Sequence, residues 1–462
     1  MNRFKETQKH TLFAIDRGKI ALWQIKKVLH CHFPDLQSRM TVLADPRKGV
    51  QYSIEELVMG AMVLFLLRST SRHDFNHKVK DGNFVQSYYR MFRLHLPGMD
   101  AVNDLFEKMD TRELEELRCL LTGSLIEKRV FHRLRFFGRY FCVAIDGTGV
   151  YHWGDSPPKD ILPYALKREY SSGKVVYSSQ VLEATLVCNN GLVIPLISEW
   201  IANDGLEYDK QDCELKAFKR LSTRLKKCFP RLNLCILADG LYTNISMMSV
   251  CQGYDWKFIT VFKDGNLPSV WQEVESLLPL SGGARKCQTQ VFDSTHMITS
   301  NYQWIKDIDY QKHSIHWVEC VQDSEHRKTG EKSTNRFVFL TNLVVDEKKI
   351  ASIIQAGRAR WCIEDHFNTQ KNRGGALHHK FNRNHFKAVK NWHNIRQLGC
   401  VICEFVKYTS EMKQVMKDNP KMTWIEIWKN LNAFLTMCVE EVKEVVALFE
   451  HWSKPRRQVR LE

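Results

Sequence analysis

The chain has 462 residues, 44% of them hydrophobic, so it is long enough to bury a large core and to form two or three domains. Its formal charge of +15 favours a polyanionic partner, with nucleic acid as the first candidate and a membrane surface as the second. No run of eighteen apolar residues and no strongly basic amphipathic helix occurs, so we expect a cytoplasmic protein without a membrane partner.

The fourteen cysteines are expected to be free thiols. Most have apolar neighbours, as Cys142, Cys188 and Cys235 do, and are expected to fill the core. The motif CVIC at 400–403 has the CxxC spacing of a metal site, but no second pair accompanies it and its surroundings are apolar and helical. This context favours core packing over zinc, and the isolated HCH at 30–32 is interpreted in the same way.

Residues 1–135 are expected to be helical. In SIEELVMGAMVLFLLRS, Ser53 is followed three residues later by Glu56, which is the capping-box pattern at the start of a helix. DTRELEELRCLLTGSLIEKR, from residue 110, has apolar residues at helical spacing. The sequence therefore predicts a helical region before the first strand.

The pattern changes to strands near residue 136. We expect a strand over 140–151, then two strands in KVVYSSQVLEATLVCNNGLVIPLISEWI joined by a hairpin turn at 189–191. A helix over 209–229, the strands NLCILADGLYT and DWKFITVFKD, and the helix PSVWQEVESLL follow. Strands mixed with helices in this way predict an α/β core with a mixed sheet.

Residues 282–345 alternate with a period of two, which predicts a β-rich insertion of antiparallel strands. The rest is expected to be helical over 346–372, 385–409 and 423–451, with a basic tail after it. We therefore expect the core to comprise 136–281 and 346–400. Helical regions, 1–135 and 401–462, are expected on either side of it.

Two acids share a context in the predicted core. Asp146 and Asp239 each end an apolar strand and are followed by glycine. Two carboxylates at neighbouring strand ends repel each other, which is costly unless a cation lies between them. Hard oxygen ligands suit Mg²⁺ or Mn²⁺.

Glu364 is the candidate for a third carboxylate. On a helix, Arg360 and Lys371 lie about 40° and 20° from it, so all three share one face, which is also typical of a solvated i,i+4 pair. The segment 358–396 contains nine Lys or Arg, five His and only two acids, which favours a metal ligand beside phosphate-binding residues. Three carboxylates that hold two metal ions, with cations nearby, are suited to phosphoryl transfer.

These segments resemble a known family. AIDGTGV, ILADGLYT and RWCIEDHFNTQK are similar to the three catalytic blocks of DDE transposases with an RNase H-like core. The resemblance is to insertion-sequence transposases of the IS-four type, whose signature is Y-x-x-R-x-x-x-E-x-x-x-x-x-x-K. Arg360, Glu364 and Lys371 fit that spacing, whereas Gly357 stands at the tyrosine position.

The resemblance implies that Asp146, Asp239 and Glu364 are catalytic and bind two Mg²⁺ ions, with Mn²⁺ as an alternative. It implies that Arg360 and Lys371 contact DNA phosphates. The further candidates for DNA contact are Arg358, Arg373 and Lys380. The implied function is cleavage at terminal inverted repeats and joining of the 3′ ends to target DNA, by a homodimer on DNA in the cytoplasm of a prokaryote.

The resemblance also assigns the flanking regions. Residues 1–135 would be a DNA-binding region, and 282–345 would be the β insertion of the family. In some members an aromatic side chain of this insertion holds a flipped base, for which Trp304 and Trp317 are the candidates here; packing inside the β region is the alternative for both.

Two other functions agree with the same residues. One is a DNA-binding protein that descends from a transposase and has lost catalysis, although all three acids are present. The other is a metal-dependent nuclease that never joins strands. Glu183 and Glu199 also lie on predicted core strands, where they could approach the metal site; roles in salt bridges or at a sheet edge are the alternative expected for them.

Overall fold

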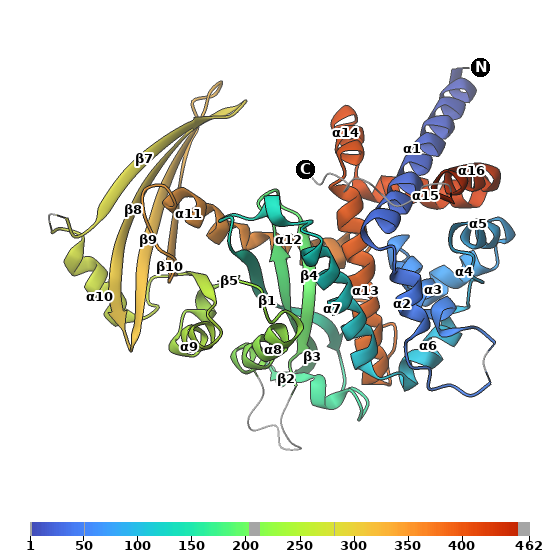
Figure 1. Ribbon diagram of the computed structural model, residues 1–462, viewed down its shortest axis with the longest axis horizontal. Coiled ribbons are helices and arrows are strands. Elements are labelled where there is room, and N and C mark those ends of the chain that lie inside the picture. The colour runs from blue at the N-terminus through green and yellow to red at the C-terminus, as the bar shows by residue number, and fades with distance from the viewer. Residues whose placement is uncertain (1, 50, 203–212, 281, 451–462) are drawn as a thin grey trace.

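A ten-stranded mixed sheet runs through the molecule, with helices packed around it (Figure 1). The computed structural model describes residues 2–49, 51–202, 213–280 and 282–450, with side chains from residue 16 onward. The strand order is β2-β3-β1-β5-β6-β10-β9-β8-β7, and β4 also pairs with β3. The strands are β1 (Phe141–Trp153), β2 (Leu166–Glu169), β3 (Val175–Val187), β4 (Val193–Trp200), β5 (Leu234–Ala238), β6 (Lys257–Val261), β7 (Arg285–Phe292), β8 (His296–Tyr310), β9 (His313–His326) and β10 (Lys332–Thr341).

The core half of the sheet begins with antiparallel strands and continues with parallel ones. β4, β3 and β1 pair antiparallel, and β5 and then β6 run parallel to β1. The predicted hairpin turn is confirmed, because it joins β3 to β4 with Gly191 at φ +86°. Glycine suits that left-handed conformation, since it has no Cβ.

The predicted β-rich segment is confirmed as four antiparallel strands, which form the long curved ribbon at the left of Figure 1. The segment does not form a separate sheet. β10 pairs with β6 through Phe339–Thr341, so the insertion extends the core sheet.

The helices before β1 agree with the expected helical region. Ser53 and Glu56 form the predicted capping box at the start of α3. No helix in the described ranges is both long and apolar enough to cross a membrane. The helices are α1 (Asn2–His32), α2 (Leu36–Thr41), α3 (Ile54–Leu66), α4 (Arg72–Val79), α5 (Gly82–Phe92), α6 (Met99–Lys108), α7 (Thr111–Glu127), α8 (Glu214–Cys228), α9 (Ile245–Gly253), α10 (Pro268–Leu277), α11 (Ile350–Ala359), α12 (Trp361–Asn372), α13 (Phe386–Lys407), α14 (Ser410–Asp418), α15 (Trp424–Met437) and α16 (Val439–Glu450), with short 3₁₀ turns η1 (His132–Leu134), η2 (Leu162–Tyr164) and η3 (Gly240–Tyr242).

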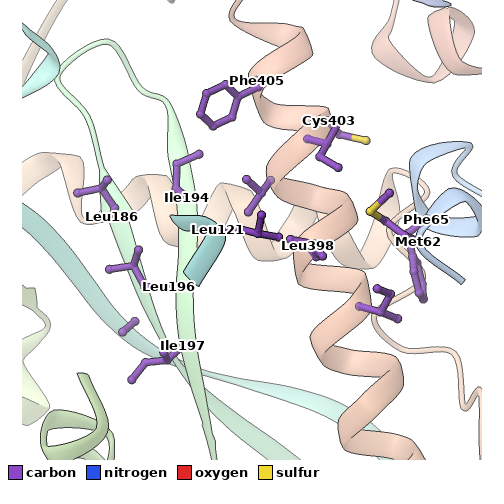
Figure 2. Close-up of a cluster of buried hydrophobic side chains, with 14 of the residues drawn as sticks. Met62, Phe65, Leu121, Leu186, Ile194, Leu196, Ile197, Leu398, Cys403 and Phe405 are labelled. Atoms are coloured by element: carbon purple, nitrogen blue, oxygen red, sulfur yellow. The ribbon is translucent and has the colours of Figure 1, made fainter. Parts of the chain in front are cut away.

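Helix α13 lies between the sheet and the N-terminal helices (Figure 2). Leu398 and Phe405 on α13 belong to one buried cluster with Ile194 of β4 and Phe65 of α3. Most of α13 is buried, and the buried part includes polar side chains such as Asn391, Arg396 and Gln397. The CVIC motif lies on α13 and is buried, which confirms that its cysteines pack in the core.

Two predicted helices are each divided in the structure. The helix expected over 346–372 is α11 followed by α12, because the amide of Arg360 bonds to the carbonyl of Gly357, three residues back, instead of four. The helix expected over 423–451 is interrupted at Cys438 between α15 and α16. Residues 209–212 of the helix expected over 209–229, and the basic tail, lie outside the described residues.

Candidate active site

Asp146 and Asp239 lie next to each other where the parallel pairing of β1 with β5 stops. The prediction that each acid ends a strand is correct for Asp239 only, because β1 continues through Asp146 to Trp153 in its pairing with β3. β1 and β5 pair in parallel register, which ends with Ala144 opposite Leu237. Two more residues along each strand reach Asp146 and Asp239. The ends of neighbouring parallel strands are where functional side chains converge in α/β sheets. The register therefore brings together two of the three predicted carboxylates.

The side chain of Asp146 lies on the face of β1 that packs against α12. Cys142 and Ala144 belong to the buried cluster that contains Phe367 of α12. Side chains two residues apart in a strand share a face, so Asp146 continues this row toward the helix. This direction brings Asp146 close to the third predicted acid.

Arg360 joins Asp146 to Glu364. Its Nη1 lies 3.5 Å from Oδ2 of Asp146, and its Nη2 donates a hydrogen bond of 2.6 Å to Oε1 of Glu364. Burial raises the pKa of Asp146 to about 6; Arg360 opposes this shift, and the negative charges of Glu364 and Glu214 add to it. The site thus concentrates more negative charge than Arg360 alone compensates.

Asp239 begins the turn after β5, where its Oδ1 accepts a hydrogen bond of 2.9 Å from the amide of Leu241. Its charge acts on the neighbouring carboxyl of Glu214. Burial raises the pKa of Glu214, and the charge of Asp239 raises it further against the effect of a hydrogen bond from Tyr242. Asp239 therefore faces the same polar space as Glu214.

Glu214 is a fourth acid in the site, which the sequence analysis missed. It is the first residue of α8, and its Oε2 accepts a hydrogen bond of 3.0 Å from the hydroxyl of Tyr242. A Cβ at Gly147 would collide with the Glu214 carboxylate, so the glycine after Asp146 provides the space for this approach. The glycine directly after Asp146 was the available signal in the sequence, but it does not identify Glu214 as the partner.

The chemistry of this acid set fits a divalent metal ion. Four carboxylates supply the hard oxygen ligands that Mg²⁺ and Mn²⁺ prefer. In the part of the chain that the structure describes, no three His, Cys, Asp or Glu side chains already converge on one metal position. The guanidinium of Arg360 lies between Asp146 and Glu364, where it compensates part of their charge.

Two predicted lysines lie on the α12 side of the acids. Burial lowers the pKa of Lys371, and the charge of Asp146 opposes that shift. Lys380 donates a hydrogen bond of 2.6 Å to the carbonyl of His152, and its ammonium lies 4.0 Å from the ring centroid of Trp153. Lys380 is thereby held at the far end of β1, the strand that carries Asp146.

The other two predicted DNA contacts are held differently. Arg358 stacks over Phe337, 4.3 Å from the ring centroid, and donates to Gln322 of the β insertion. Arg373 lies 3.9 Å from Asp365 at the end of α12. Arg358 thus lies near the junction of α11 and α12, and Arg373 lies at the end of α12.

The two tryptophans that were candidates for base stacking are buried. Trp304 is 3% exposed and Trp317 is 1% exposed, so both pack inside the β region, which is the alternative expected for them. The exposed aromatic ring at the site is that of Trp361, at 62%. Its neighbour Arg360 lies 5.2 Å from the ring centroid.

Glu199 forms ion pairs, as expected from the sequence, whereas Glu183 bonds to His393, whose pKa is lowered by burial. Glu183 is opposite Asp146 in the sheet, but its Oε1 lies 2.7 Å from Nε2 of His393 on α13. Glu199 pairs with Arg220 and Arg224 of α8. Both acids thus connect the sheet to its covering helices.

This sequence matches no protein-family model, and no curated protein matches it.

Proposed function

We propose that this protein is a DDE transposase with an RNase H-like core, which cleaves DNA at transposon ends and transfers the strands into target DNA. The supporting observation is that acids far apart in the sequence approach one edge of the sheet. Asp146 of β1 and Asp239, directly after β5, lie on neighbouring strands where their parallel pairing stops, and Arg360 links Asp146 to Glu364. Three antiparallel strands followed by two parallel ones agree with the expected core.

A bound cation would reduce the repulsion between the neighbouring carboxylates of the site. Asp146, Asp239 and Glu364 would hold two Mg²⁺ ions, with Glu214 as a further carboxylate. Bound metal activates an attacking hydroxyl and neutralises charge at the phosphate. Burial disfavours the charged form of Asp146, and a cation would favour it.

The cations beside the acids suit the DNA backbone. Arg360 lies between Asp146 and Glu364, and Lys371 lies near Asp146; both would bind the phosphates next to the reacting bond. The exposed ring of Trp361 adjoins Arg360 and offers a surface on which an unpaired base can stack. These groups position the strand, whereas the acids serve the chemistry.

The decisive experiment is a cleavage assay with Mg²⁺ on DNA that carries the inverted repeats flanking the coding region. Asp146→Asn, Asp239→Asn and Glu364→Gln should each lower the cleavage rate by roughly 100-fold or more. Asp365→Asn is the matched control, because it replaces the adjacent, exposed acid of the same helix. Equal loss in the control, or full activity in the three variants, would contradict the assignment.

The products separate this proposal from its alternatives. A transposase joins pre-cut 3′ ends to a second DNA, a nuclease cuts without joining, and a non-catalytic binder retains affinity without cleavage. In each case DNA affinity should fall steeply with salt, because each neutralised phosphate releases counterions. Affinity that is insensitive to salt would argue against DNA as the partner.

A further inference from the structure

Helices α7 and α8 meet along a row of side-chain pairs. Glu115 of α7 pairs with Arg224 of α8. One turn further along each helix, Sγ of Cys119 lies 2.8 Å from Sγ of Cys228. Because successive pairs are four residues apart on both helices, the two thiols belong to an ordered contact between the helices.

We infer that Cys119 and Cys228 are an oxidation site that forms a disulfide on exposure to a peroxide. A disulfide requires an S–S distance of about 2.05 Å, so the two sulfurs need to approach by less than about 1 Å. Both side chains are half-buried, so a small oxidant reaches them. The bond would connect residues 109 positions apart and fasten α8, which carries Glu214, to α7.

The environment distinguishes the two thiols. A hydrogen bond from Cys119 lowers the pKa of Cys228, and the same bond raises the pKa of Cys119. The thiolate is the form that peroxides oxidise, so Cys228 reacts first. Its sulfur attacks hydrogen peroxide and becomes a sulfenic acid, with release of water after protonation; the Cys119 thiol then attacks that sulfur, and the disulfide forms as a second water leaves.

A second thiol pair in the chain provides an internal comparison. Cys142 and Cys235 lie opposite each other on β1 and β5, and burial leaves only 1% and 0% of them exposed. Closeness alone would make both pairs reactive. If the peroxide also has to reach the sulfur atoms, only the pair between α7 and α8 reacts.

The test uses the reduced full-length protein, treated with a small excess of hydrogen peroxide and then with N-ethylmaleimide. Two of the fourteen thiols should be lost, and mass spectrometry of a non-reduced digest should find one peptide pair, which joins Cys119 to Cys228. The oxidised protein should unfold at a higher temperature until dithiothreitol is added.

Variants make the outcome specific. Cys228→Ser should abolish both the cross-linked peptide and the stabilisation, whereas Cys213→Ser, which removes an exposed thiol just before α8, should leave both unchanged. The inference would be overturned by a cross-link between Cys142 and Cys235 instead. Conversion of Cys228 to sulfinic acid without a cross-link would overturn it as well.

Discussion

Gly357 stands at the tyrosine position of the signature that this sequence resembles, and its surroundings leave no room for a side chain. It lies on α11, and a Cβ placed there would be 2.8 Å from the ring of Phe339, which is buried in β10. Any larger side chain has to displace that ring or the helix. A tyrosine at this position is therefore incompatible with the packing of α11 on the sheet.

Gly357→Ala should lower the free energy of unfolding by about 1–2 kcal/mol, because the cost of overpacking exceeds the helical preference of alanine. Gly123→Ala is the control, since it is also inside a helix, but its new Cβ would meet only one atom, of Phe229 at 4.0 Å. That variant should gain up to about 1 kcal/mol. Urea unfolding measures both, and equal effects would refute the steric account.

The acids of the site differ in how far the sequence could predict them. Asp146 and Asp239 each follow an apolar run of residues, and Glu364 is an acid in a basic segment, so the local sequence pattern indicates each of them. Glu214 is an ordinary charge at a helix start, and its place depends on how α8 packs beside Gly147. The exposure of Trp361 likewise depends on packing that no local pattern records.

At the scale of elements, α12 is fastened to α13 by a buried polar network. The amides of Gln370 and Gln397 exchange hydrogen bonds of 3.0 and 3.2 Å. Gln397 also donates a hydrogen bond of 3.3 Å to Glu183 on β3. These contacts fix the helix that carries Glu364, because buried polar groups are costly when they lack partners.

Gln397→Leu should lower the free energy of unfolding by about 2–4 kcal/mol, since it leaves Gln370 and Glu183 with fewer partners in the interior. Gln414→Leu is the control, because it removes an exposed amide that bonds to Asp418, and it should change stability by less than about 0.5 kcal/mol. Chemical denaturation of both variants provides the measurement. Similar values for the two would show that the network does not fasten α12.

Element type followed from periodicity, but element ends did not. The alternation over 282–345 predicted the strands of the insertion, and the hairpin turn at 189–191 predicted the link from β3 to β4. Neither interruption, at Arg360 or at Cys438, has a proline, and the glycine near the first of them, Gly357, lies inside α11. Such breaks arise from tertiary packing, so the sequence pattern predicted one continuous helix in each case.

At the scale of the whole molecule, the helices at the two ends of the chain pack together. Arg17 of α1 donates a hydrogen bond to Asn419, and Lys27 of α1 pairs with Glu411 of α14. Helix α1 belongs to the region 1–135 and α14 to the region 401–462, so their contact could not be predicted from the local sequence pattern. Folding of one end therefore depends on the other.

His32 makes the packing of α1 against the C-terminal helices sensitive to pH. It ends α1, is 3% exposed, and its ring lies 4.8 Å from that of Phe405 on α13. Burial lowers its pKa to about 4, whereas an unfolded histidine titrates near 6.5. Between these values the unfolded chain binds a proton that the folded chain does not, so stability falls as the pH falls through this window.

The expected loss from His32 is about 3 kcal/mol between pH 7.5 and pH 4. His32→Leu keeps an apolar contact with Phe405 and removes the titrating group, so urea unfolding across this range should show a weaker pH dependence by that amount. At pH 7.5 the variant should be at least as stable as the wild type, because Nε2 of His32 is a buried atom without a hydrogen-bond partner among the described residues. If both proteins lose stability equally on acidification, other groups carry the effect, and the contact between α1 and α13 is not what acid weakens.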